Sequence, residues 1–214
     1  LKISDIYLSW GWKFNNPNVI PFTSPHNKNE YNYNLKNKNI LLVTVMKSRY
    51  SAGLYSGAHS SQWNDYVDDQ LNFLSNINKN IINNMVIREK HEIATYAWNL
   101  KELIENRYPF IKFSKKNTSL LDEYKRSKII VVTYNGTALL ETMMFNIPTI
   151  IFYNFKVWRI NQEVKKKYQL LKDVGILFDD SKQAADHLNS IYDNPLNWWN
   201  SKDVKNAREY FCKN

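Results

Sequence analysis

The residues with the clearest chemical pattern follow an apolar run, KIIVVTY (128–134). That run ends at Asn135-Gly136-Thr137, helical spacing follows, and Glu141 comes one turn past Thr137. Glycine lets a ligand approach the backbone closely, and we expect the Thr137 hydroxyl to cap a helix whose free N–H groups attract phosphate. A carboxylate one turn further on the same face suits ribose hydroxyls. The spacing predicts a bound nucleotide, although an ordinary helix cap and a surface Glu141 would give the same pattern.

Four further polar side chains lie at or after the ends of apolar strand segments. Arg88 comes directly after an apolar stretch and His91 three residues later, while Lys47 and Arg49 follow the run NILLVTV (39–45). Because the carboxyl ends of parallel strands meet at one edge of a sheet, these groups are candidates to neutralise a diphosphate or the carboxylate of an acidic sugar. Each of them is also compatible with a plain surface role.

No pattern of metal ligands stands out. Asp68-Asp69 fall within a predicted helix, Asp179-Asp180 precede a helix start, and no D-x-D motif follows a suitable strand. We therefore expect neither a metal nor a cofactor. The chain has one cysteine, so it forms no internal disulfide, and a reducing compartment is expected.

Charge and composition favour an anionic ligand. The 214 residues include 29 Lys and Arg against 20 Asp and Glu, a net charge of +9, and 43% of them are hydrophobic. Such a chain is globular, and its charge favours phosphates, nucleotides and anionic lipid headgroups. The cations are dispersed, apart from short runs such as Lys165-Lys166-Lys167. We expect no nucleic-acid partner, because a basic helix face is usually just solvated.

Strands and helices alternate along most of the chain. Predicted strands cover 39–45, 84–89, 110–113, 128–134, 148–153 and 175–179, and predicted helices cover 62–82, 93–106, 118–126, 137–145, 157–172, 182–192 and about 200–211. Strands that are apolar on both faces and alternate with helices form a parallel sheet covered on both sides. The sequence therefore predicts an α/β fold, a Rossmann-like doubly wound parallel sheet over residues 40–193.

The two ends of the chain lie outside this alternation. Residues 1–26 are expected to be the end of a preceding N-terminal domain and its hinge, and the polar stretch 27–39 a linker. Residues 194–214 are expected to form a C-terminal helix that crosses back to that domain, with Trp198 and Trp199 packing it in place. The chain is thus expected to be one part of a larger protein.

The stretch SKIIVVTYNGTALLETMMFNIPTIIF resembles the donor-binding segment of two-Rossmann-domain (GT-B) glycosyltransferases. Together, LSWGWK, TYNGTALLE, NIPTIIF and WW-x-S-x-x-V are similar to transferases of bacterial surface-carbohydrate clusters. The residues that match the donor-binding turn of the family are Thr133, Asn135, Gly136, Thr137 and Glu141.

The resemblance implies a C-terminal donor-binding domain. It would hold a nucleotide-sugar donor, whose sugar moves to a surface glycan or a lipid-linked acceptor in a metal-independent reaction. If the reaction inverts configuration, the catalytic base would come from the N-terminal domain, and no catalytic residue is assigned in this chain. The resemblance also implies a cytoplasmic location, and the basic charge favours the inner face of the cytoplasmic membrane, as a peripheral contact with anionic lipid.

Two alternatives remain open at this point. A non-hydrolysing sugar-nucleotide epimerase uses two similar domains, but it needs several acid–base groups, and His91 is the one evident candidate. A non-enzymatic nucleic-acid-binding module would need basic residues interleaved with exposed aromatics, a pattern that only the Tyr-rich linker approaches.

Overall fold

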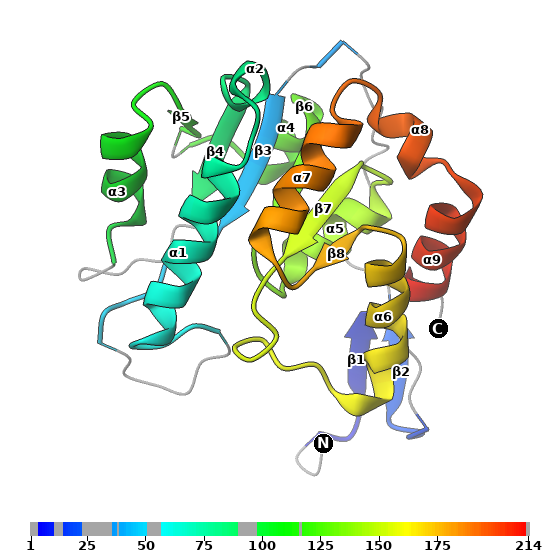
Figure 1. Ribbon diagram of the computed structural model, residues 1–214. Helices are drawn as coiled ribbons and strands as arrows, with labels where there is room; N and C mark the ends of the chain where they lie inside the picture. Colours follow the sequence, from blue (N-terminus) through cyan, green and yellow to red (C-terminus); the bar gives the residue numbers. More distant parts are fainter. Residues whose placement is uncertain are drawn as a thin grey trace.

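Six parallel strands build the main sheet of the computed structural model, which describes residues 4–10, 15–22, 36–37, 39–50, 57–89, 98–115 and 117–212. The strand order is β5-β4-β3-β6-β7-β8 (Figure 1). The strands are β3 (Asn39–Thr44), β4 (Met85–Glu89), β5 (Lys112–Phe113), β6 (Ser127–Val132), β7 (Thr149–Phe152) and β8 (Leu177–Phe178). This order is the doubly wound order of a Rossmann fold, so the predicted α/β parallel sheet is confirmed.

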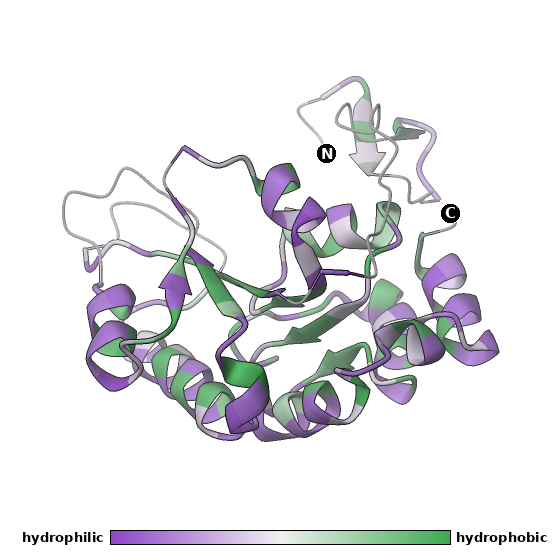
Figure 2. Cartoon of the chain, turned by 90° about the horizontal axis from the view of Figure 1, so that it is seen from above, coloured by the Kyte–Doolittle hydropathy of each residue, from purple (hydrophilic) through white to green (hydrophobic). Residues whose placement is uncertain are grey.

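Helices cover both faces of the sheet. Those that follow the strands are α1 (Gln62–Ser75), α2 (Lys79–Ile82), α3 (Leu100–Arg107), α4 (Leu120–Lys125), α5 (Thr137–Met144), α6 (Lys165–Asp173), α7 (Ser181–Ile191), α8 (Pro195–Trp199) and α9 (Lys202–Cys212). Helices α1 and α7 pack together over one face, and α4 and α5 lie over the other (Figure 1). Their outer surfaces are hydrophilic and the strands between them hydrophobic (Figure 2).

The central strands are buried on both faces because their residues are apolar without alternation. All four residues of β7 are buried, as are all but one in β3 and in β6. In β4, next to the edge strand, buried and partly exposed residues alternate. Phe73 of α1 stacks on Phe152 of β7 with ring centroids 4.7 Å apart, which ties one helical layer to the sheet.

Several helix ends follow from local sequence. Ser119 caps α4 by accepting the Asp122 N–H, and Asp180 caps α7 by accepting the Gln183 N–H. Both caps use a short polar side chain that satisfies a free helix N–H. Such caps explain why these two helices begin within two residues of their predicted starts.

Two predicted helices differ from the structure. The predicted helix 62–82 ends at Ser75 and resumes as α2, because the Asn76 side chain donates to the Asn72 carbonyl and competes with the helix. The predicted helix 157–172 begins as an α-helix only at Lys165, after a 3₁₀ turn at Gln162–Val164. Asn161 caps that turn by accepting the Glu163 N–H, so the preceding residues stay in a loop.

The C-terminal helices pack on the main domain. Trp199 is fully buried and donates to the Asn146 side chain over 2.9 Å, and Arg208 lies 4.1 Å from the Trp199 ring centroid. Phe211 of α9 meets Tyr168 of α6 edge to face. The predicted packing role of the tryptophans is confirmed, and a crossing of α9 to a preceding domain stays a prediction.

Near the N-terminus, β1 (Tyr7–Trp10) and β2 (Val19–Phe22) form a separate parallel pair. Their exposed large apolar side chains include Tyr7, Leu8, Ile20 and Phe22. Most of the predicted linker 27–39 lies outside the described residues. Among the helices of the described part of the chain, none is both long and apolar enough to cross a membrane.

Candidate nucleotide-binding site

The candidate site lies where β3 and β6 adjoin in the middle of the sheet. From β3 the chain continues through α1 to β4 on one side, and from β6 it continues through α5 to β7 on the other. In doubly wound sheets this reversal opens a crevice at the carboxyl ends of the strands, where ligands bind. The predicted residues of the β6–α5 loop and those that follow β3 are both at this edge.

Thr133 is buried directly after β6, with no exposed surface. Its hydroxyl donates to the Val43 carbonyl over 3.1 Å, so the Tyr66 hydroxyl, 2.7 Å away, must donate to it. Tyr66 in turn accepts the Val45 N–H over 3.0 Å, and burial raises the pKa of the Tyr66 phenol. These hydrogen bonds join α1, β3 and β6. Contact of Thr133 with a ligand stays a prediction.

Helix α5 begins at Thr137 without a side-chain cap. Its N-cap residue is Gly136, in an extended conformation, so the expectation that the Thr137 hydroxyl caps the helix is wrong. A Cβ at Gly136 would lie 2.5 Å from Cε2 of Tyr134, so the buried tyrosine ring already excludes any side chain here. The exposed Thr137 and the start of α5 remain suited to an anion.

Asn135 connects this loop to α6. Its side-chain oxygen accepts a hydrogen bond from the Tyr168 hydroxyl over 3.2 Å. Burial raises the pKa of Tyr168. Asn135 therefore positions the loop against α6, in addition to its predicted contact with a ligand.

Glu141 is partly buried and faces two tyrosines. Its Oε2 accepts a hydrogen bond from the Tyr124 hydroxyl over 3.1 Å, and its second carboxylate oxygen makes no hydrogen bond to a described residue. Burial, together with the Glu141 charge, raises the pKa of Tyr124 and raises that of Tyr134 to about 12. Both phenols are therefore neutral near pH 7, and one carboxylate oxygen is fixed while the other can accept a ligand hydroxyl.

Arg88 sits in β4 on the side of the sheet near Tyr124. Its Nη1 donates to Ser114 Oγ over 3.1 Å and to the Thr118 carbonyl over 2.8 Å. Ser114 donates in turn to the buried Glu123 carboxylate over 2.6 Å. The Arg88 charge opposes the rise in the Tyr124 pKa, so the guanidinium lies near the group that holds Glu141. Arg88 thus anchors the segment before α4 and adds positive charge to the Glu141 region.

The remaining predicted residues lie near β3 or outside the described part of the chain. The Lys47 carbonyl accepts the Trp98 N–H over 3.1 Å, and the Arg49 guanidinium lies 5.2 Å from the Trp98 ring centroid. Both follow the carboxyl end of β3, as predicted. His91 lies outside the described residues. The structure therefore brings Lys47, Asn135 and Gly136 to one edge of the sheet, and places Glu141 beside the tyrosines behind it.

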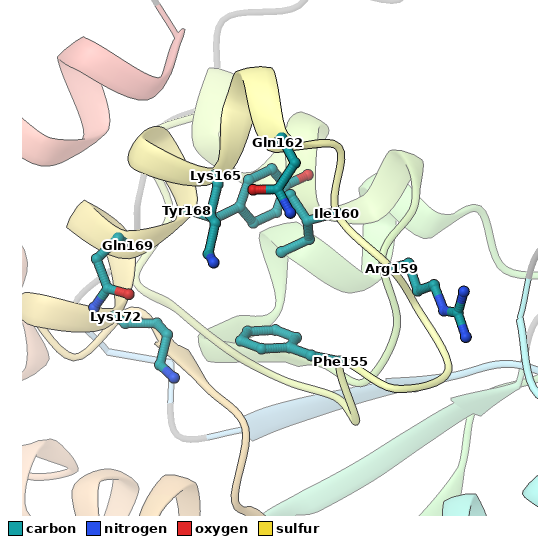
Figure 3. A pocket seen from close by; sticks show the side chains of 8 residues that line it. All are labelled: Phe155, Arg159, Ile160, Gln162, Lys165, Tyr168, Gln169 and Lys172. Atoms are coloured by element: carbon teal, nitrogen blue, oxygen red, sulfur yellow. The ribbon is translucent and has the colours of Figure 1, made fainter.

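A pocket that sequence reasoning missed lies between the β7–α6 segment and α6 (Figure 3). Its volume is about 440 Å³. The residues that line it are Phe155, Arg159, Ile160, Gln162, Lys165, Tyr168, Gln169 and Lys172. The lysine run at 165–167 is a sequence signal of such a basic pocket. The pocket was not predicted because these lysines were expected within one continuous helix.

Within the described residues, no group of three or more His, Cys, Asp or Glu side chains is arranged to hold a metal ion. The site offers a helix N-terminus, a carboxylate held by tyrosine, and several cations. Such groups can bind a phosphorylated, hydroxylated ligand by hydrogen bonds and charge.

Comparison with known proteins gives three findings. Among curated proteins, none matches the chain. Ten chains of solved structures match, among them WaaG, a glycosyltransferase involved in lipopolysaccharide biosynthesis, at 12% identity and a TM-score of 0.43, over 82% of this chain. The chain spans 43% of the WaaG chain. The model of the LIC12162 family of transferases matches residues 1–214, and the chain therefore belongs to the LIC12162 transferase family.

Proposed function

We propose that this chain is the donor-binding domain of a GT-B glycosyltransferase that moves a sugar from a nucleotide-sugar to a bacterial surface glycan. The observation that carries the proposal is the Glu141 carboxylate. Tyr124 holds one of its oxygens, and the other makes no hydrogen bond to a described residue, one turn past the start of α5 at the reversal of the sheet. Membership of a transferase family favours transfer over epimerisation.

The proposed nucleotide lies along the start of α5. Its phosphates occupy the Asn135-Gly136-Thr137 loop, where backbone N–H groups and the helix dipole favour negative charge. Its ribose hydroxyls donate to Glu141. Lys47 and Arg49, after β3, stabilise the charge that develops on the leaving phosphate.

The other parts of the reaction are proposed to lie outside this chain. A preceding domain would supply the acceptor site and the catalytic base, and the acceptor is a glycan or a lipid-linked sugar. We propose a metal-independent reaction without a cofactor, at the inner face of the cytoplasmic membrane. The net charge of +9 supports contact with anionic lipid.

The test begins with a thermal-shift screen of the protein against UDP, GDP, CMP and TDP. A nucleotide that binds only the folded state stabilises it by about 2.7 kcal/mol at one hundred times its dissociation constant. Calorimetric titration of wild type, Glu141→Ala and Glu141→Gln with that nucleotide follows. A charge-assisted hydrogen bond to the free carboxylate oxygen contributes roughly 1.5–3 kcal/mol, so Glu141→Ala should weaken binding at least about tenfold. Glu141→Gln keeps one acceptor oxygen and should weaken it less.

A matched control is Tyr124→Phe, which removes the hydrogen bond between Tyr124 and Glu141 but leaves the Glu141 carboxylate in place. This variant should keep most of the affinity. Unchanged affinity in Glu141→Ala would refute the donor site, and so would an equal loss in Tyr124→Phe, because Glu141 would then act only through the tyrosine. Circular dichroism of each variant confirms that the fold is retained.

A further inference from the structure

The pocket beside α6 has the size and shape of a small-ligand site. Its volume of about 440 Å³ falls within the usual range of ligand pockets, about 300–1,000 Å³. Phe155 lies on one side, and the side chains of α6 lie on the other (Figure 3). The space is several times larger than an isolated phosphate ion would need.

The charge of this pocket is positive. Arg159, Lys165 and Lys172 line it, and no acidic side chain does. Lys172 pairs with Asp179 over 2.7 Å, whereas Arg159 and Lys165 form no ion pair with any described residue. Two cations are therefore exposed and uncompensated at its rim.

The position of Lys165 at the start of α6 is a second reason to expect an anion in the pocket. Lys165 is the first residue of α6, Lys166 and Lys167 follow, and the first turn carries no acidic residue. A helix N-terminus favours anions, and cations there are unfavourable by about 0.3–1 kcal/mol each. An anion bound in the pocket would offset the unfavourable charge of Lys165 at this helix start.

The lining also carries groups that suit a sugar ring. Gln162 presents an amide that can both donate to and accept from hydroxyls. The Gln169 amide nitrogen donates to Asp173 over 2.8 Å, and its oxygen can accept from a hydroxyl. Phe155 and Ile160 offer apolar surface. Tyr168 lines the pocket and donates to Asn135, so the pocket adjoins the loop at the start of α5. The neighbouring Tyr153 is 2% exposed, and its buried hydroxyl has no partner among the described residues.

We propose that this pocket binds an anionic sugar, one that carries a carboxylate or a phosphate, next to the nucleotide. The inference rests on the proposed function, because the adjoining α5 loop is where that proposal places the phosphates. Lys165 and Arg159 bind the charged group, the glutamine amides bind hydroxyls, and Phe155 and Ile160 contact the ring. The pocket then selects an acidic sugar over a neutral one.

The test is a titration of the isotope-labelled protein in which the NMR signals of Phe155 and Tyr168 are monitored. The probes are glucuronate, glucose 6-phosphate, glucose and inorganic phosphate. We expect both anionic sugars to shift these signals and to bind at least about tenfold more tightly than glucose or inorganic phosphate. The affinity should fall as NaCl is raised, because exposed charges are screened.

The variant Arg159→Gln/Lys165→Gln should bind the anionic sugars at least about tenfold more weakly than wild type does. Its matched control is Lys202→Gln/Lys205→Gln, which removes two exposed lysines of α9 outside the pocket and should bind as wild type does. Both variants lower the net charge equally, so a nonspecific charge effect would weaken both.

Three results would overturn the proposal. If glucose binds equally well, the pocket does not select charge. If inorganic phosphate binds as tightly as glucose 6-phosphate, the pocket is a plain phosphate site. If Arg159→Gln/Lys165→Gln binds as wild type does, the sugar binds elsewhere. Because no nucleotide is present, these results are independent of the Glu141 titrations, so failure of this proposal and failure of the donor site are distinguishable.

Discussion

At the scale of single residues, Thr133 shows how one hydroxyl can serve the fold at the place where a ligand is expected. It donates to Val43, accepts from Tyr66, and has no exposed surface. Two elements distant in sequence meet at this hydroxyl, directly at the carboxyl ends of β3 and β6. The first role of the Thr133 hydroxyl is therefore to stabilise the fold.

Thr133→Val should lower the free energy of unfolding by about 1–3 kcal/mol, because the buried Tyr66 hydroxyl loses its acceptor while the shape is kept. Urea denaturation of both proteins measures the change. The matched control is Thr137→Val, which removes an exposed hydroxyl and should change stability by less than about 0.5 kcal/mol. Equal stability of Thr133→Val and wild type would contradict the structural role.

At the scale of elements, the turn from α6 into β8 is built as a Schellman motif. The Ile176 N–H donates to the Leu171 carbonyl and the Gly175 N–H to the Lys172 carbonyl. Gly175 has φ of +74°, in the left-handed region where glycine is favoured. A Cβ there would also lie 3.2 Å from Cε1 of His187. This turn ends the pocket-lining helix and directs the chain back into the sheet.

Gly175→Ala should destabilise the protein by about 1–2 kcal/mol, because alanine is strained at positive φ. Gly175→Asn should cost less, since asparagine tolerates this conformation although it adds the same Cβ. Repeating Gly175→Ala in a His187→Ala background separates the contact with the imidazole from the backbone strain. Thermal or urea unfolding of wild type, both Gly175 variants, His187→Ala and the double variant measures both effects. A Gly175→Ala protein as stable as wild type would exclude both.

At the scale of the whole molecule, the described residues form one complete doubly wound sheet and a separate parallel pair, β1 and β2. Two-stranded sheets are marginal by themselves, and Tyr7, Leu8, Ile20 and Phe22 of this pair are exposed. In the proposed enzyme, chemistry takes place between two domains whose closure excludes water and assembles the site.

The chain of 214 residues is therefore expected to bind the nucleotide but not to transfer sugar. Incubation with the nucleotide-sugar of the screened base and a glycan acceptor, followed by chromatography of the nucleotide, measures turnover. Sustained release of the nucleotide that depends on the acceptor would show that this chain already contains the catalytic groups. The control is the calorimetric titration, which must show binding in the same preparation.

The local sequence was sufficient to predict the alternation of strands and helices and the start of α5. Apolar runs without alternation, as in β6 and β7, predict strands buried on both faces, and Asn135-Gly136-Thr137 marks the turn into the helix. These signals depend on neighbouring residues, so they can be found without the tertiary structure. The Thr137 cap was nevertheless predicted wrongly, because the extended Gly136 became the N-cap.

The tertiary structure decided the environment of each side chain. The Tyr66–Thr133 bond joins residues 67 positions apart, and the partner of Glu141 is Tyr124 of another helix. The pocket exists because the residues before the 3₁₀ turn at Gln162–Val164 stay in a loop instead of extending α6. Helical spacing permits a helix over 157–172, and it carries no information on which distant surface Trp158 packs against, here Tyr66 of α1. Periodicity is local, whereas burial, hydrogen-bond partners and cavities depend on segments that folding brings together, and that is why only the folded chain determined them.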